Sequence, residues 1–221
     1  MSDILGVIFD MDGVLVDSYL PHFVSWQETA SKFGLELTEE QFRGTFGQTS
    51  GSIIRQLWGE GVLTPEQMTD FDHIKEARYR ELVVAELPIM PGARELVRNL
   101  HSDRIPLAIG SSGPPENVQL AASALGGSGL FSAFVTGRDV QHGKPDPQVF
   151  ILAAEKLGIP PDRCVVIEDA PVGIEAATRA GMKSIGLQSP PPRNRDLSRA
   201  TLVIDSLSSL STSRIREVLE L

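Results

Sequence analysis

Short apolar runs that alternate with helical patterns are the feature of this sequence that most restricts its fold. The runs are rich in valine and isoleucine and span residues 4–9, 105–110, 133–136, 164–167, 184–187 and 202–204. Runs this short and apolar are typical of strands that are buried on both faces. Because helical patterns separate them, the sequence predicts an α/β fold with a doubly wound parallel sheet.

Helical patterns between the later runs open on prolines. They begin at Pro91, Pro114, Pro147 and Pro171. Proline favours the first turn of a helix because its φ angle is already helical and its missing N–H is not needed there. The last pattern is followed by Gly181, a common stop signal. We therefore expect each of these prolines to lie at or near the start of a helix.

Residues 17–88 interrupt this alternation. The segment has no apolar run of the strand type, and two threonines, Thr38 and Thr64, are each followed three residues later by glutamine, as in a capping box. We predict a small helical cap domain over residues 17–88, inserted into a Rossmann-like core formed by residues 1–16 and 89–221. Two linkers in these places would allow the cap to move as a lid.

The overall charge restricts the partners of this chain. Its 221 residues include 20 Lys plus Arg and 29 Asp plus Glu, for a formal net charge of −9. An acidic chain of this kind has no general affinity for nucleic acid or anionic membranes. No segment reaches the apolar length of a membrane span, and residues 1–12 lack the basic stretch of a signal peptide. We expect a cytoplasmic protein that is a monomer or weak dimer.

Four polar clusters follow expected strands, which is where ligands bind in an open parallel sheet. They are residues 10–18, 110–113, 143–147 and 168–169. They contain the groups that phosphoryl transfer needs: a nucleophile, a proton donor, hydroxyl and amide donors, a cation and acidic metal ligands. Each cluster alone is a weak signal, whereas four in this order on one edge of the sheet are a strong one.

Asp10 and Asp12 are two residues apart and would face the same side of a regular strand. Two close carboxylates can divide labour if their environments separate their pKa values. One would attack phosphorus while the other holds a proton for the leaving oxygen. The alternative for this cluster is an ordinary turn at the end of a strand, because Asp and Gly both favour turns.

The other clusters have similar alternatives. Ser111 and Ser112 precede a helix start, where free amides and the helix dipole attract anions, although an ordinary cap is the alternative. Lys144 stands at a turn where lysine is usually solvated. Glu168 and Asp169 follow a buried run, and Asp169 could cap the next helix instead. Mg²⁺ prefers one or two carboxylates, so Asp169 together with the nucleophilic aspartate forms a sensible ligand set.

Together these residues resemble the four motifs of the haloacid dehalogenase superfamily. The motifs are Asp10-x-Asp12-Gly13-Val14-Leu15-x-Asp17-Ser18, Ser111, Gly143-Lys144-Pro145-x-Pro147 and Glu168-Asp169-Ala170-x-x-Gly173-Ile174-x-Ala176-Ala177. The resemblance covers nearly the whole chain, and it is greatest to the β-phosphoglucomutase-like and small-phosphatase branch, whose helical cap matches residues 17–88. It implies Mg²⁺ as the cofactor and a small phosphorylated metabolite as the substrate.

The resemblance also implies roles for the matched residues. Asp10 would form an aspartyl-phosphate. Asp12 would act as general acid and then general base, and its backbone carbonyl would ligate Mg²⁺. Relatives that cleave carbon–halogen bonds or phosphonates lack this second aspartate, so Asp12 indicates cleavage of a P–O bond.

Four further residues complete the implied site. Ser111 and Lys144 would hold the transferring phosphoryl group. Asp169 would ligate Mg²⁺, with Glu168 as a further ligand or a supporting acid.

Cap residues select the substrate in this branch. His22 and Lys75 match positions that reach the site in relatives, although an ordinary surface or interface histidine and a solvated lysine are the alternatives. Trp26 is expected in the core. We also expect Gly47, which begins a loop over residues 47–52, and Ser112 to contact the substrate.

The loop over residues 47–52 differs from the mutase pattern. In β-phosphoglucomutases it carries an arginine for the far phosphate, but Ser50 stands at about that place here. Arg43 and Arg55 flank the loop. A mutase must hold a bisphosphate in two orientations, so the missing two-pronged donor favours a phosphatase. A phosphosugar mutase and a catalytically silent binding module are the alternatives, and the complete set of motif residues disfavours the silent module.

Overall fold

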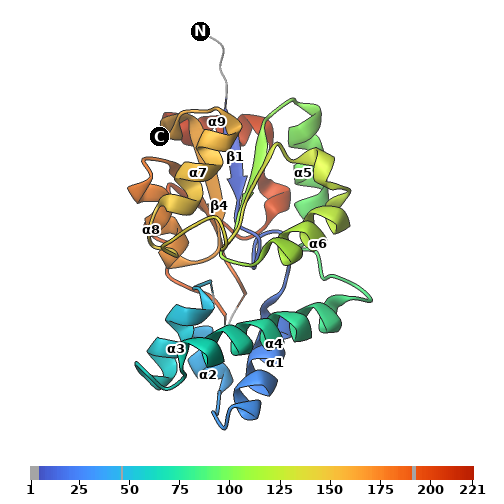
Figure 1. Cartoon of the computed structure of the whole chain (residues 1–221). Helices are drawn as coiled ribbons and strands as arrows, with labels where there is room; N and C mark the ends of the chain where they lie inside the picture. The colour runs from blue at the N-terminus through green and yellow to red at the C-terminus, as the bar shows by residue number, and fades with distance from the viewer. Residues whose placement is uncertain (1–4, 46, 191–192) are drawn as a thin grey trace.

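The computed structural model describes residues 5–45, 47–190 and 193–221. Ile4, at the start of the first apolar run, lies outside the described residues. Figure 1 shows a sheet with helices on both faces and a separate group of helices at one end of it. None of the helices in the described ranges is long and apolar enough to cross a bilayer.

Within the described residues, six strands form one sheet in the order β3-β2-β1-β4-β5-β6. The strands are β1 (Gly6–Phe9), β2 (Leu107–Gly110), β3 (Ala133–Val135), β4 (Cys164–Glu168), β5 (Lys183–Leu187) and β6 (Leu202–Ile204). Every neighbouring pair is parallel. The prediction of a doubly wound parallel sheet is therefore confirmed, and each apolar run forms a strand.

Both faces of the sheet are covered by helices. On one face lie α7 (Gln148–Leu157) and α8 (Pro171–Arg179), and on the other lie α5 (Ala93–Ser102), α6 (Pro115–Leu125) and α9 (Thr212–Glu220). Successive side chains of β1 point to opposite faces of the sheet, so Val7 and Phe9 pack into the apolar cluster on one face and Ile8 into the cluster on the other. The described part of the chain also forms three short 3₁₀ helices: η1 (Ser128–Leu130), η2 (Pro161–Arg163) and η3 (Leu207–Ser209).

Burial differs between the centre and the edge of the sheet. Residues of β1, β2 and β4 are buried throughout. The expectation of burial on both faces is wrong for β6, where Val203 is 42% exposed. β6 has one neighbouring strand and lies at the edge, so its outer face remains in contact with solvent.

The prolines lie where the sequence places them, at or just before helix starts. Pro171 is the first residue of α8, Pro114 and Pro147 are the N-cap residues directly before α6 and α7, and Pro91 lies two residues before α5. α5 begins at Ala93, after Gly92 with a φ of 82°. A Cβ atom at residue 92 would lie 2.5 Å from Oγ of Ser208, so this turn requires glycine for its space as well as for its backbone.

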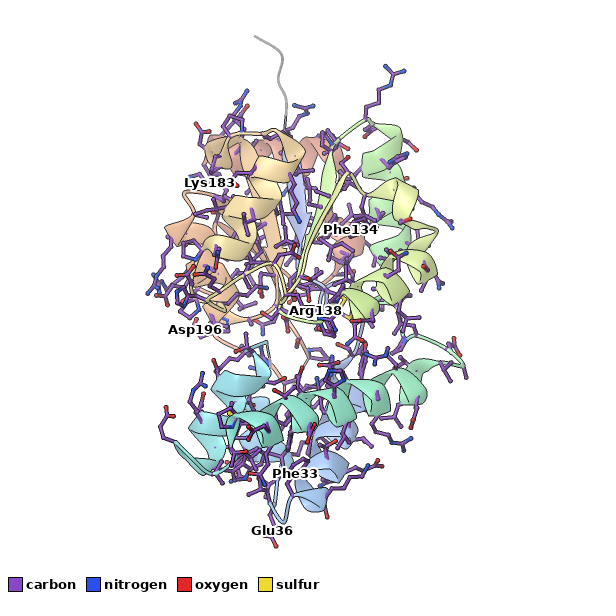
Figure 2. The ribbon with its side chains drawn as sticks, in the orientation of Figure 1. Phe33, Glu36, Phe134, Arg138, Lys183 and Asp196 are labelled. Carbon is purple, nitrogen blue, oxygen red and sulfur yellow. The ribbon has the colours of Figure 1, made fainter. Side chains whose placement is uncertain are left out.

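Four helices, which we call the cap helices, lie at the end of the sheet where the strands finish (Figure 1). They are α1 (Tyr19–Lys32), α2 (Glu39–Arg43), α3 (Ser50–Trp58) and α4 (Pro65–Val83). Their own apolar cluster includes Trp26, Phe42 and Phe71, and the Trp26 and Phe71 rings are 5.1 Å apart. Figure 2 shows Phe33 and Glu36 at the end of this group that points away from the sheet.

The local signals within the cap helices have mixed outcomes. Both predicted capping boxes, at Thr38 and Thr64, are present. The prediction of a loop over residues 47–52 is wrong from Ser50 onward, because α3 begins there. The Thr49 hydroxyl accepts a hydrogen bond from the backbone N–H of Ser52 and so caps this helix.

The two connections between the sheet and the cap helices run side by side. The backbone N–H of Asp17 donates to the carbonyl of Pro88 at 2.7 Å, and that of Met90 donates to the carbonyl of Leu15 at 3.0 Å. The two connections are thus hydrogen-bonded to each other, near the predicted linkers. We propose residues 17–88 as a cap domain on this basis, with residues 1–16 and 89–221 as the core.

Candidate active site

The residues predicted for the site come from different elements and meet at one end of the sheet. Asp10 and Asp12 follow β1, Ser111 follows β2, and Asp169 follows β4, while Lys144 precedes α7. The strands are parallel and neighbouring, so their carboxyl ends lie together, facing the cap helices (Figure 1). The fold therefore brings together side chains that are far apart in the sequence, such as Asp10 and Asp169, which are 159 residues apart.

Lys144 is the central cation of this cluster. Its side chain is 2% exposed, and its Nζ lies 2.5 Å from Oδ1 of Asp10 and 2.8 Å from Oε1 of Glu168. The alternative of a solvated lysine is therefore wrong. Burial lowers the pKa of Lys144, but the carboxylates of Asp10 and Glu168 outweigh burial and raise it above its ordinary value, so the ammonium stays charged.

The acids around Lys144 are crowded and buried. Oxygen atoms of Asp10, Glu168 and Asp169 all lie within 4.8 Å of one another. Burial raises the pKa of Asp10 well above its ordinary value, against the charge of Lys144, and burial raises the pKa of Asp169 to about 7. The guanidinium of Arg195 lies 3.8 Å from Oδ2 of Asp169, so Lys144 and Arg195 together face three buried carboxylates and do not balance them. A divalent cation among them would favour their ionised forms, so this donor set fits Mg²⁺.

Glu168 contacts both Lys144 and the start of the next helix. Its Oε2 accepts a hydrogen bond from the backbone N–H of Ala170 at 2.6 Å. The alternative in which Asp169 caps α8 is wrong, because Ala170 is the N-cap residue of this helix. The Asp169 carboxylate is thereby left facing the acidic cluster.

Glycine at residue 13 allows the chain to turn directly against Asp169. Gly13 has a φ of 85°, and a Cβ atom there would lie 2.4 Å from Oδ2 of Asp169. Its backbone N–H donates to the carbonyl of Val16 at 2.8 Å. β1 ends at Phe9, so Asp10 and Asp12 lie beyond the regular strand, and both still line one cavity. The turn and the site are therefore compatible interpretations of this segment.

Asp12 is held by two side chains of the cap connection. Its Oδ1 accepts a hydrogen bond from Oγ of Ser18 at 2.5 Å and lies 3.1 Å from Nε2 of His22. Burial raises the pKa of Asp12, but the charge of His22 and the hydrogen bonds from His22 and Ser18 outweigh burial, so this pKa is lowered. The two pKa values are therefore separated as predicted, but in the direction opposite to the predicted roles, because the shifts favour Asp12 as the anion and Asp10 as the protonated acid.

His22 lies inside the molecule and not on its surface. The residue is 6% exposed, and its ring stacks on Tyr79 of α4 with the ring centroids 3.9 Å apart. The alternative of an ordinary surface histidine is therefore wrong. α1 and α4 together fix the imidazole against Asp12.

A cavity between the sheet and the cap helices contains most of the predicted residues. Its lining includes Asp10, Asp12, His22, Gly47, Lys75, Ser111 and Ser112. Ser111 is buried, and its Oγ accepts a hydrogen bond from the N–H of Gly113 at 3.0 Å. Both serines precede α6, whose N-terminal end therefore faces the cavity.

The cap side of the cavity contains Lys75, Gly47 and Trp26. Lys75 is 4% exposed, so the alternative of a solvated helix face is wrong. Gly47 has a φ of 96°, and a Cβ atom there would lie 3.4 Å from Cβ of Ala170, where the cap meets the core. Trp26 belongs to the apolar cluster of the cap, as expected, and also lines the cavity.

Comparisons with known proteins identify the family. A family model for haloacid dehalogenase-like hydrolases matches residues 4–181. The chain belongs to this family. Hexitol phosphatase A of Escherichia coli is 34% identical over 212 residues, which cover 95% of this chain and 94% of that protein. Beta-phosphoglucomutase of Bacillus subtilis is 30% identical over 218 residues, with 96% and 94% covered.

A solved structure of the same family confirms the fold. A crystal structure of beta-phosphoglucomutase from Clostridium difficile has a TM-score of 0.87 and 27% identity, and covers 98% of this chain and 97% of that one. The predicted resemblance to this family and its β-phosphoglucomutase-like branch is thus confirmed. Its relatives include both phosphatases and mutases.

Two residues of this haloacid dehalogenase-like site were not found from the sequence. Glu76 lines the cavity beside Lys75, and Asn117 lies buried behind it. A signal for Glu76 does exist: the buried face of α4 includes Phe71 and Tyr79, which follow a helical period, and Glu76 falls on that face. Asn117 gives the same kind of signal, because the buried face of α6 includes Ala121 and Leu125, which follow it at a helical period.

The two arginines near the cavity are not part of its described lining. Arg43 and Arg55 are both missing from the lining residues in the described part of the chain. Arg55 lies instead 3.8 Å from Glu60. Ser50, at the place expected for an arginine in a mutase, lines the cavity and donates a hydrogen bond to Oδ1 of Asp72 at 2.5 Å.

Proposed function

We propose that this protein is a Mg²⁺-dependent phosphatase that hydrolyses a small phosphomonoester, such as a sugar phosphate, through an aspartyl-phosphate at Asp10. The observation that carries this proposal is the buried Asp10–Lys144 pair at the cavity, with Asp12 held separately by His22. The ammonium of Lys144 and a bound divalent cation would favour the ionised Asp10 that a nucleophile needs, against the effect of burial. The similarity to hexitol phosphatase A supports a phosphorylated polyol or sugar as the substrate class.

The first step would form the aspartyl-phosphate. Asp10 attacks phosphorus while Lys144 and the Ser111 hydroxyl bind the phosphoryl oxygens, aided by the N-terminal end of α6. Asp12 gives a proton to the leaving oxygen. The negative charge of a bound phosphomonoester beside Asp12 opposes its ionised form, so substrate binding favours the protonated acid that this step needs.

The second step would release phosphate. Asp12, now ionised, accepts a proton from water, which attacks the phosphorus of the aspartyl-phosphate, and Asp10 is regenerated. The hydrogen bonds from Ser18 and His22 hold Asp12 in its ionised form in the free enzyme, which suits the base that this step requires.

We propose Asp10, Asp169 and the backbone carbonyl of Asp12 as the ligands of Mg²⁺. When bound, Mg²⁺ would neutralise charge on the phosphoryl oxygens. Both carboxylate oxygens of Glu168 already accept a hydrogen bond, one from Lys144 and one from Ala170. This favours Glu168 as the acid that supports Lys144, with metal ligation as the alternative.

A phosphosugar mutase is the second candidate, since beta-phosphoglucomutases are similar to this chain in sequence and structure. It would share every core residue. Against it stands the cavity, which has no arginine among its described lining residues to grip a second phosphate. We therefore place hydrolysis first.

The test is release of phosphate from p-nitrophenyl phosphate and from a panel of sugar and polyol phosphates, with Mg²⁺ and with EDTA. Asp10→Asn should abolish turnover and keep the circular dichroism spectrum, whereas Asp162→Asn, at an exposed aspartate, should leave turnover unchanged. Full activity of Asp10→Asn would remove Asp10 as the nucleophile. Conversion of β-glucose 1-phosphate to glucose 6-phosphate without net phosphate release would support the mutase.

A further inference from the structure

Lys75 and Glu76 form a buried ion pair at the edge of the active-site cavity. The Nζ of Lys75 lies 2.5 Å from Oε1 of Glu76, and the two side chains are 6% and 9% exposed. Both residues line the cavity. The positive charge that Lys75 brings to the cavity is therefore already matched by a carboxylate before any substrate binds.

Glu76 is also fixed from the core side. Its Oε2 accepts a hydrogen bond from Nδ2 of Asn117 at 2.6 Å, and Oδ1 of Asn117 accepts one from Nη1 of Arg80 at 3.2 Å. The carboxylate is thus oriented by α4 and α6 together. A carboxylate can accept about four hydrogen bonds, so about two positions remain for donors in the cavity.

Glu76 stands where the active-site cavity opens into a side cleft. Ser50, Glu76 and Ser112 line both the cavity and the cleft, whose volume is about 390 Å³. The phosphoryl group would lie at Asp10, so the rest of a substrate would extend toward these three residues. The Glu76 carboxylate is therefore placed to contact the body of the substrate and not its reacting phosphate.

The side cleft has no unmatched lysine or arginine in the described chain. Arg138, which lies at the boundary between sheet and cap helices (Figure 2), forms a 3.0 Å ion pair with Glu116. Asp72, which also lines the cleft, accepts a hydrogen bond from Ser50. A second phosphate or a carboxylate on the substrate would meet the carboxylates of Glu76 and Asp72 here, and it would have to compete with Glu116 for the guanidinium of Arg138. The described lining also includes His73.

We propose that Glu76 is a specificity-determining residue that accepts hydrogen bonds from hydroxyl groups of an uncharged sugar or polyol and rejects substrates with a second anionic group. The proposal rests on the proposed phosphatase function. Hydroxyl groups are donors and satisfy the free positions of a fixed carboxylate, whereas an anion beside it is repelled in a buried site. Selectivity would thus come from an attractive and a repulsive element at one residue.

The test compares three substrates. D-Glucitol 6-phosphate has an uncharged polyol body, fructose 1,6-bisphosphate has a second phosphate, and p-nitrophenyl phosphate has no hydroxyl groups. In Glu76→Gln, kcat/KM for the polyol phosphate should fall roughly 10- to 100-fold, mainly through KM, because a charged hydrogen-bond acceptor becomes neutral. For p-nitrophenyl phosphate, kcat/KM should stay within about threefold of the wild-type value. The ratio of kcat/KM for the bisphosphate to kcat/KM for the polyol phosphate should rise at least about tenfold. Glu81→Gln, on the exposed side of the same helix, is the control.

Equal losses on all three substrates would overturn the proposal, because they would indicate a role in folding or in the chemical step. An unchanged ratio between polyol phosphate and bisphosphate would overturn it as well. If the wild type hydrolyses none of them, the phosphatase function fails and calorimetric binding decides the role of Glu76. The proposal is supported if the wild type binds the polyol phosphate more tightly than the bisphosphate and if Glu76→Gln reduces this difference in affinity. Tighter binding of the bisphosphate by the wild type contradicts it.

Discussion

Oε1 of Glu168 lies 1.7 Å from the position that a Cβ atom on residue 173 would occupy. Gly173, in the first turns of α8, therefore leaves the space in which the Glu168 carboxylate reaches Lys144. Any side chain at residue 173 must displace this carboxylate or the helix. The glycine thus supports a contact in the active site without lining the cavity itself.

Gly173→Ala should lower both stability and turnover. The added methyl group displaces Glu168, so the free energy of unfolding should fall by about 1–3 kcal/mol, as for other overpacked sites. Turnover should fall as well, because Lys144 loses one of its two partners. Urea unfolding and p-nitrophenyl phosphate hydrolysis measure the two effects.

Gly129→Ala is the matched control for this substitution. No atom lies within 4 Å of a Cβ at residue 129, and its φ is not positive. It should change the free energy of unfolding by at most about 0.5 kcal/mol. If Gly173→Ala is as mild as this control, the close approach to Glu168 has no energetic importance.

Lys144→Met should destabilise the protein and nearly abolish turnover. The substitution removes the one ammonium between Asp10 and Glu168, which are both buried. Breaking a buried ion pair on one side costs about 3–5 kcal/mol. Loss of a positive charge that binds the phosphoryl oxygens should lower kcat by about 10²–10³-fold. Urea unfolding and steady-state kinetics are the measurements.

Lys156→Met provides the comparison for Lys144→Met. Lys156 lies 3.3 Å from Asp139, with a side chain that is 43% exposed. Exposed pairs contribute at most about 1 kcal/mol, and this one is remote from the cavity, so turnover should be unchanged. Comparable losses in both variants would show that Lys144 has no special role.

The strands and the order of the site residues could be predicted because the signals are local. A run such as residues 164–167 is apolar on both faces whatever its neighbours are, and the polar residues after it must lie at the strand end. Parallel pairing then places these ends together. For this reason Asp10, Lys144 and Asp169 were predicted to meet, and the structure brings them together.

The partners of the cap residues could not be predicted in this way. Lys75 and Glu76 lie in a polar stretch, and their burial depends on how α4 packs on α1 and on the end of the sheet. The hydrogen bond between Glu76 and Asn117 joins residues 41 apart in two helices. The helical period of α4 indicates which face is buried, but neither it nor any motif identifies Asn117 as the partner of Glu76.

Glu76→Gln should lower the free energy of unfolding relative to wild type at neutral pH but not at acid pH. Burial raises the pKa of Glu76, but the charge of Lys75, then that of His22, and hydrogen bonds from Lys75 and Asn117 outweigh burial and lower it below the ordinary 4.5. A lowered pKa contributes stability above the unfolded value, and this contribution is lost as the pH falls through the folded value. Hydrogen bonds to a charged group are worth about 1.5–3 kcal/mol, so a loss of that order is expected at pH 7.

Urea unfolding from pH 7 to pH 3.5 measures this effect. The difference in free energy of unfolding between wild type and Glu76→Gln should be constant above about pH 5 and shrink below about pH 4.5. Glu86→Gln, at an exposed glutamate, should show no such difference. A difference that grows toward acid pH would contradict the ion pair as the source of the shift.

Asp12→Asn should separate chemistry from binding. Asparagine keeps the size of the side chain and an Oδ1 that accepts hydrogen bonds from Ser18 and His22, so the fold and ground-state binding should be retained. The variant lacks the proton donor of the first step and the base of the second. Steady-state turnover should therefore fall by about 10²–10⁴-fold.

The size of this loss should depend on the leaving group of the substrate. A good leaving group needs little protonation, so Asp12→Asn should still form aspartyl-phosphate at Asp10 from an activated ester, in a burst followed by slow release. A sugar phosphate, with a poor leaving group, should show no such burst. Quench-flow on both substrates, with Asp162→Asn as the control, measures these phases. Unchanged steady-state rates on both substrates would remove Asp12 from the mechanism, and with it the main reason to prefer cleavage of a P–O bond.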